Sequence, residues 1–300
     1  MINPIKNAES VLSKKAVLTV LTISQWSARR FDKKLTNDVH TSHGMQDDAG
    51  RYNKQLLAKD ALEKITHIHN KARGYNWSKT LPWMDMDGQR LLPAVAYIEY
   101  TNEMRKLKEE FSSAVKEFVA AYPTFVEAAK KRLNGAFDPA DYPDQSQIGH
   151  RFYFDVAVMP CPSSDFRCDI ASEQLADIEA DVQKRLAAGL HDAQKFALEK
   201  AATLVSTMVD RLRAYKPAAE KGEKTEGRLY GSLVDNIREF VPVLRTFNFA
   251  DDPVINTLAD KMEKDLCAFD APELRESDNA REKVADAAEK ILKDVTKFMA

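Results

Sequence analysis

Aromatic and cationic side chains are interleaved in the first 90 residues, and this pattern has the clearest chemical meaning in the chain. Cations can follow a phosphate backbone and release its counterions, while ring faces stack on bases whatever their sequence. The pattern therefore predicts binding of nucleic acid, preferably single-stranded. The residues expected to make these contacts are Arg29, Arg30, Lys33, Lys34, Lys54, Lys71, Arg73 and Trp77, and the rings that could add stacking are Trp26, Trp83 and Tyr75.

A purely structural role for these side chains is the competing interpretation. Tryptophan is usually largely buried, so Trp26 and Trp83 could anchor a core while the lysines only solvate its surface. The charge distribution is unusual: residues 1–80 hold 14 Lys and Arg against 7 Asp and Glu, whereas the whole chain has a net charge of −2. Such asymmetry is typical of a basic binding surface, an acidic tail, or both.

Histidines and cysteines are grouped in three places that could supply metal ligands. These groups are His40 with His43, His67 with His69, and Cys161 and Cys168 with His150. The histidine spacings are loose, and residues two apart on a helix do not face one another. The cysteine group offers three ligands where a structural zinc site needs four. We therefore expect no metal, but polar histidines on a basic surface and a structural pair of half-buried cysteines.

The sequence also lacks a convincing catalytic motif. GEKT at residues 222–225 resembles the end of a phosphate-binding loop, but Pro217 stands where that loop has its first glycine. Glycine is scarce, at 10 of 300 residues, about half its usual share of roughly 7%. No serine lies in a nucleophile elbow, and no cysteine lies in a setting that marks a reactive thiolate. We expect no enzyme and no cofactor.

The elements that would position the basic and aromatic residues occupy an N-terminal region over residues 1–92. Residues 16–26 are rich in Val, Ile, Leu and Thr, which favours a strand. A polar stretch follows over 27–50, and the leucines and isoleucines of residues 51–73 indicate a helix. Residues 74–92 read as irregular. The region is therefore predicted to contain a strand plus a helix.

Residues 93–216 show sustained helical periodicity on both sides of a small β insert. The first stripe, from Ile98 to Leu133, is interrupted by Pro123, which should kink or restart the helix. The second begins at Ser172, a suitable N-cap, and continues to about Tyr215. Roughly 44 residues at about 1.5 Å each would span on the order of 65 Å. Such a helix must pack lengthwise, most simply antiparallel to the helix over 94–133 in a coiled-coil-like hairpin.

The β insert over residues 136–171 is predicted from alternation along HRFYFDVAVMP. Phe152, Phe154, Val156 and Val158 should face one way, while the residues between them face the other. CPSSD would turn the chain, FRCDI would return it, and the N-terminal strand could complete a three-stranded sheet. A hairpin alone is only marginally stable, so it needs such a partner or a helix beneath it.

A polar linker over residues 217–228 separates the hairpin from an acidic C-terminal part over 229–300. Residues 229–246, 254–267 and 279–299 read as three shorter helices, and residues 249–300 hold 13 acidic and 8 basic side chains. An acidic tail could compete with nucleic acid for the basic face or recruit basic proteins. The predicted fold class is mainly α with a small β-sheet, comprising the long helical hairpin with its β insert and a C-terminal helical bundle.

The N-terminus and the cysteine count bear on the compartment. The apolar run near the N-terminus is about eight residues long and interrupted by threonines, which is too short and too polar for a signal sequence or a membrane span. The three cysteines are an odd number, which is typical of reduced thiols. We expect a cytoplasmic protein that does not bind a membrane.

Four segments resemble a group of uncharacterised proteins encoded by bacteriophages and prophages. The segments are LTISQWSARR (21–30), LPWMDMDGQRLLP (81–93), FDPADYP (137–143) and FYFDVAVMPCPSSDFRCD (152–169). The resemblance covers roughly residues 16–215, and its motifs look structural. It implies a phage accessory protein in the bacterial host cytoplasm, acting in DNA metabolism or against host defences, and it carries over no site residues.

Two functions from different classes are compatible with these features. The first is a non-enzymatic protein that binds nucleic acid through its N-terminal basic and aromatic region. The alternative is a coiled-coil scaffold or adaptor whose long helices bind a host or phage protein, for example a defence factor. Because long amphipathic helices often pair between chains, we also expect a homo-oligomer.

Overall fold

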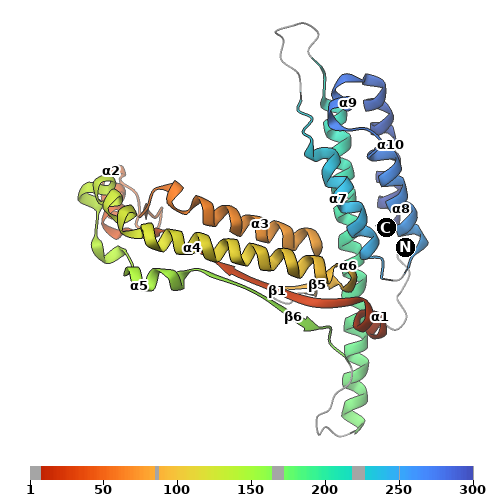
Figure 1. Cartoon of the computed structure of the whole chain (residues 1–300), viewed down its shortest axis with the longest axis horizontal. Coiled ribbons are helices and arrows are strands. Elements are labelled where there is room, and N and C mark those ends of the chain that lie inside the picture. Colours follow the sequence, from red (N-terminus) through yellow and green to blue (C-terminus); the bar gives the residue numbers. More distant parts are fainter. Residues whose placement is uncertain (1–7, 85–87, 164–171, 218–226, 250, 300) are drawn as a thin grey trace. The chain divides into compact units, whose positions relative to one another are not determined.

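The structure, a computed structural model, describes residues 8–84, 88–163, 172–217, 227–249 and 251–299 (Figure 1). The chain forms two compact units. Unit 1 comprises Met1–Val20, Trp77–Glu99 and Ala157–Ala300, and unit 2 comprises Leu21–Asn76 and Tyr100–Val156. Among the described helices of sufficient length, none is apolar enough to cross a membrane.

Unit 1 is built mainly from helices. They are α1 (Ala8–Lys15), α6 (Ser172–Ala214), α7 (Ser232–Thr246), α8 (Pro253–Lys261), a π-helical turn η6 (Met262–Leu266), α9 (Ala271–Glu276) and α10 (Asp278–Met299). The predicted C-terminal helices over 229–246, 254–267 and 279–299 are thus present with small shifts at their ends. Asp252 caps α8 by accepting a hydrogen bond from the backbone N–H of Val254. Asp270 forms a capping box with Glu273 at the start of α9, a helix that the sequence analysis did not predict.

Helix α6 carries the core of unit 1. Its predicted apolar stripe is buried at Leu186, Leu190, Ala197, Ala201, Met208 and Leu212. The stripe packs chiefly against α10, with α7 and α1 also against it. The C-terminal end of α6 meets the first half of α10, where Arg213 pairs with Asp286 and Glu289, so the two helices are antiparallel (Figure 1). The long antiparallel partner of α6 is therefore α10, whereas the sequence analysis expected residues 94–133 in that place.

A four-stranded sheet has the order β4 (Leu81–Pro82), β5 (Gln89–Pro93), β1 (Ala16–Ser24), β6 (Tyr153–Pro160). β1 is antiparallel to β5, with Ala16 opposite Pro93 and Val20 opposite Gln89. The N-terminal strand does lie beside the strand of the β insert, as predicted. The expected return strand over residues 166–170 lies outside the described residues. The prediction that residues 74–92 are irregular is wrong, because they contain β4, an edge strand that tolerates Pro82, and β5.

Unit 2 contains a two-stranded ribbon and several short turns beside a pair of helices. Its elements are β2 (Arg29–Phe31), α2 (Lys33–His43), β3 (Asn53–Gln55), the 3-10 turn η1 (Lys59–Leu62), α3 (Glu63–Lys79), α4 (Tyr97–Leu133), and the short turns η3 (Asn134–Ala136), η4 (Pro139–Asp141), α5 (Gln145–Ile148) and η5 (Gly149–Arg151). The elements β1, α3, α4 and β6 each contribute residues to both units. The helix predicted over 51–73 instead begins at Glu63, after a strand and a turn.

The core of unit 2 lies along α4. Its predicted stripe is buried at Met104, Leu107, Phe111, Phe118 and Tyr122. Phe111 packs edge-on against Phe154 of β6, and Phe118 packs edge-on against Phe152, so the first half of the predicted alternation is confirmed. α3 packs beside α4, where the Tyr100 hydroxyl donates to Asn76 Oδ1 over 2.7 Å. Two details differ from expectation: Ile98 is exposed, and α4 continues through Pro123 without a break.

Gly227 provides a test of the packing at the end of α6. Its φ is +74°, and a Cβ at this position would lie 2.8 Å from the carbonyl oxygen of Ala214. Gly227→Ala is therefore expected to lower the free energy of unfolding by about 2 kcal/mol, since left-handed backbone costs most residues roughly 1–2 kcal/mol before the contact is counted. Urea unfolding followed by circular dichroism measures this change. Gly135→Ala is the control, because nothing lies within 4 Å of its Cβ; an equal loss there would contradict the explanation.

Candidate nucleic-acid interface

The predicted cations Arg29 and Arg30 lie in a two-stranded antiparallel ribbon of unit 2. β2 pairs with β3 so that Arg29 lies opposite Gln55, Arg30 opposite Lys54 and Phe31 opposite Asn53. Because opposed residues share a face and successive residues alternate, Arg30 and Lys54 face one side while Arg29 and Phe31 face the other. Arg29, Arg30 and Phe31 are all exposed.

Exposed rings and cations gather around this ribbon. The Phe31 ring is 47% exposed, and the guanidinium of Arg51 lies 5.9 Å from its centroid. Tyr52, which is 48% exposed, accepts the backbone N–H of Asp32 at its carbonyl and so extends the ribbon by one residue. Lys33 and Lys34 follow in the first turn of α2, which contains no acidic residue. We define the ribbon surface as Arg29, Phe31, Lys33, Lys34 and Arg51.

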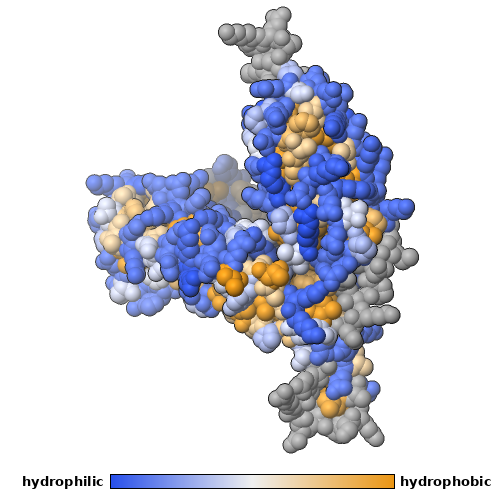
Figure 2. Space-filling model, turned by 45° about the vertical axis from the view of Figure 1, so that its right-hand side comes forward, coloured by the Kyte–Doolittle hydropathy of each residue, from blue (hydrophilic) through white to orange (hydrophobic). Residues whose placement is uncertain are grey.

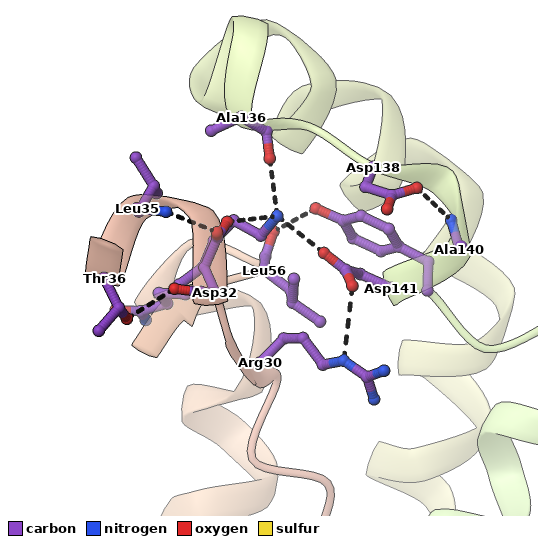
Figure 3. Close-up of polar contacts among 12 residues, drawn as sticks. Arg30, Asp32, Leu35, Thr36, Leu56, Ala136, Asp138, Ala140 and Asp141 are labelled. Atoms are coloured by element: carbon purple, nitrogen blue, oxygen red, sulfur yellow. Dashed lines mark hydrogen bonds and ion pairs between the residues drawn. The ribbon is translucent and has the colours of Figure 1, made fainter. Parts of the chain in front are cut away.

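Lys54 fixes the inner side of the ribbon and is only 5% exposed. Its ammonium lies 2.8 Å from Asp141 Oδ2 and 3.2 Å from Asp32 Oδ2, and it donates to the carbonyl oxygen of Ala136 over 2.8 Å. In Figure 3, Asp32 comes from the ribbon side and Asp141 from the segment after α4, and Arg30 approaches Asp141 from outside. The buried lysine therefore joins the ribbon to the segment that follows α4.

The pKa values follow from these contacts. The backbone N–H of Leu35, which caps α2 on Asp32, and then the Lys54 ammonium lower the pKa of the Asp32 carboxyl. Burial alone would lower the pKa of Lys54, but the hydrogen bonds and charges of Asp141 and Asp32 outweigh burial and raise it. One internal cation thus neutralises much of the charge of both carboxylates. The outward cations of the ribbon surface are consequently not balanced by Asp32.

Lys54 and Trp83 must be removed from the predicted contact residues. Lys54 is buried in the network just described, so its charge cannot reach a phosphate. Trp83 is 0% exposed and belongs to the core of unit 1 with Leu18 and Leu91, so neither ring face can stack on a base. The structural interpretation of Trp83 is the correct one.

The remaining predicted residues of unit 2 are placed less favourably than the ribbon. Trp26 is half-buried and edge-on to Tyr122, with 6.0 Å between the ring centroids. Tyr75 is half-buried and stacked on Tyr100, also at 6.0 Å. Lys71 and Arg73 are exposed on α3, and the Lys71 ammonium lies 3.8 Å from Glu103, which partly neutralises it. None of these forms part of the ribbon surface.

Trp77 is the most exposed tryptophan, at 62%, and it belongs to unit 1 rather than to the unit of the ribbon. The guanidinium of Arg90 lies 5.0 Å from its ring centroid. The sequence analysis placed Trp77 in one surface with Arg29 and Arg30, whereas the structure assigns these residues to two separate units. Arg90 was missed because its position opposite Pro82 depends on the strands β4 and β5, which were not predicted.

The chain matches no protein-family model, no curated protein and no solved structure. Function must therefore be argued from the side chains. Hydrophilic side chains cover most of the face that Figure 2 shows, and the hydrophobic ones gather in separate patches.

The candidate metal ligands are not brought together within the part of the chain that the structure describes, where no group of three His, Cys, Asp or Glu could hold a metal ion. His40 is buried, and its Nε2 lies 3.1 Å from the carbonyl oxygen of Gly50. Cys161 is buried with its thiol 3.6 Å from the carbonyl oxygen of Ala16, and burial raises its pKa to about 11. Cys168 and residues 222–225 lie outside the described residues.

Proposed function

We propose that the protein binds single-stranded nucleic acid through the ribbon surface of unit 2. The observation that carries the proposal is the exposed Phe31 ring beside Arg51, on a ribbon whose Asp32 carboxylate is held by Lys54. An open ring face is what a nucleobase stacks on, and the surrounding cations suit the phosphates. A single strand is preferred to a duplex because paired bases cannot offer their faces to a side chain.

The position of Lys33 and Lys34 supports the proposal. The positive end of the helix dipole makes cations unfavourable in a first turn, by about 0.3–1 kcal/mol each. Asp32 already accepts the N–H of Leu35 there. Two lysines at this position do not stabilise α2, but they would add to the attraction that a helix N-terminus exerts on a phosphate.

The resemblance to phage and prophage proteins adds a biological setting to the proposal. On that basis the protein would act as a non-enzymatic accessory protein in the cytoplasm of a bacterial host. The scaffold alternative is not proposed, because it needs a free apolar stripe on the long helices. The stripe of α6 is buried against α10 and α7, and the stripe of α4 is buried against β6 and the segments around it.

Fluorescence anisotropy with a labelled oligothymidylate tests the proposal. Four cations of the ribbon surface, each neutralising one phosphate, predict a slope of log affinity against log salt of about −2.8 for a single strand. Affinity should therefore fall roughly 50-fold between about 50 and 200 mM salt. A duplex of equal length should bind more weakly. Binding that does not depend on salt, or that is as tight for the duplex, would contradict the proposal.

A further inference from the structure

Trp77 belongs to unit 1 and is not part of the ribbon surface of unit 2. The indole is 62% exposed, whereas Trp83 in the same unit is fully buried. So large an apolar surface is costly to leave in water, because tryptophan is normally mostly buried. The exposed indole leaves part of a ring face open to a ligand.

Arg90 covers part of the Trp77 ring and is itself held in place. Its guanidinium lies 5.0 Å from the ring centroid. Nε donates to Thr80 Oγ1 over 2.6 Å and a terminal nitrogen donates to the Thr80 carbonyl oxygen over 2.9 Å. The backbone of Arg90 is fixed in β5, opposite Thr19 of β1 and Pro82 of β4. The cation is thus positioned before any ligand arrives, which lowers the entropic cost of binding.

Lys200 of α6 brings a second cation to the same place. Its ammonium lies 3.5 Å from the Trp77 carbonyl oxygen and 5.2 Å from the centroid of the buried Phe240 ring. Burial and the positive charge of Arg90 lower the pKa of Lys200. The two positive charges repel each other, and an anion bound near both would relieve that repulsion.

We infer that Trp77, Arg90 and Lys200 form a second nucleotide-binding site, in which a nucleobase stacks on the open part of the indole and its phosphate lies between the two cations. The ring supplies a stacking surface and the cations supply the charge complement, which are the two features that a nucleotide needs. The inference rests on the proposed function only for the class of ligand. The site belongs to unit 1 and is separate from the ribbon surface of unit 2.

The indole itself reports on the site. Titration of the full chain with deoxyadenosine monophosphate should quench tryptophan emission in a saturable way, and Trp77→Phe should remove that quenching while Trp26 and Trp83 still emit. Trp77→Ala should weaken binding of a labelled oligothymidylate by about 5- to 150-fold, the loss expected for one stacked base. Arg90→Gln and Lys200→Gln should each weaken it with the indole intact, and inorganic phosphate should compete weakly.

Tyr230→Ala is the matched control. Tyr230 is another exposed ring of unit 1, at 54%, but its arginine neighbour, Arg228, contacts the hydroxyl rather than the ring face. Its removal should change nothing. An equal loss with Tyr230→Ala, or quenching that persists in Trp77→Phe, would overturn the inferred site.

Failure of this site and failure of the proposed function are distinguishable. If an Arg29→Ala, Arg51→Ala double variant loses affinity while Trp77→Ala retains it, the inferred site is wrong and the ribbon surface stands. If Trp77→Ala loses affinity and the double variant does not, the inferred site stands and the ribbon surface falls. If neither responds, both are wrong.

Discussion

Lys54→Met is expected to lower the free energy of unfolding by about 3 kcal/mol, because it leaves Asp32 and Asp141 buried without their shared cation. Removing one partner of a buried ion pair typically costs about 3–5 kcal/mol. The lower end applies here, since Asp32 keeps the Leu35 N–H and Arg30 lies 3.5 Å from Asp141. Methionine retains most of the lysine's apolar stem, so the change isolates the charge. Urea unfolding of the Lys54→Met variant and of the unchanged chain measures the difference in free energy of unfolding.

Lys108→Met is the matched control for this prediction. Lys108 also contacts one carboxylate, Asp155, over 2.9 Å, but both side chains are about half exposed. Exposed ion pairs contribute about 0–1 kcal/mol, so this variant should lose no more than that. Asp141→Asn added to Lys54→Met should restore part of the loss, because it removes a charge that the first change left unpaired. Equal losses for the two lysines would contradict the role assigned to Lys54.

The contacts between Lys54 and its two aspartates also make the stability of the fold depend on pH. The folded state lowers the pKa of Asp32, so this carboxylate stabilises the fold above its unfolded pKa and the contribution is lost as pH falls through the lowered folded pKa. The folded state raises the pKa of Lys54, so its contribution is complete below the unfolded pKa and is lost as pH rises through the folded pKa. Lys54→Met should remove the alkaline loss and move the acid loss to higher pH.

The position of Lys54 shows where prediction from sequence stops. In the sequence it is one lysine among several in a basic segment, and nothing marks it as buried. Its burial depends on Asp141, which is 87 positions away along the chain. Asp141 reaches Lys54 only because the segment that follows α4 lies beside the ribbon. Local patterns cannot report a contact at that separation. The paired aspartates, likewise, appear in the sequence as ordinary surface charges.

Periodic patterns were more informative than isolated residues. The stripes of α4 and α6 and the start of the alternation along β6 could all be predicted, because burial of one face repeats with the period of the element. The partner of each face could not. α6 has an apolar stripe that would fit any complementary helix, and only the folded chain selects α10. For the same reason Trp77 and Trp83, six positions apart, have opposite exposures that composition alone does not distinguish.

The Arg29→Ala, Arg51→Ala double variant is expected to weaken binding by removing two cations of the ribbon surface. Both guanidiniums are exposed on the outer face of the ribbon, and neither takes part in the Lys54 network, so the fold should be unchanged. Loss of two contacts to phosphate should weaken binding of oligothymidylate at low salt by about 10- to 100-fold. The slope of log affinity against log salt should also become shallower by about 1.4.

The salt slope separates the two parts of the proposed contact. Phe31→Ala removes a stacking surface without removing charge, so affinity should fall by about 1–3 kcal/mol while the slope stays the same. An Arg105→Ala, Arg151→Ala double variant removes the same net charge from exposed positions of unit 2 outside the ribbon surface. It should leave both quantities nearly unchanged. If this control matched the ribbon variant, attraction would depend only on net charge, and a localised site at the ribbon would be excluded.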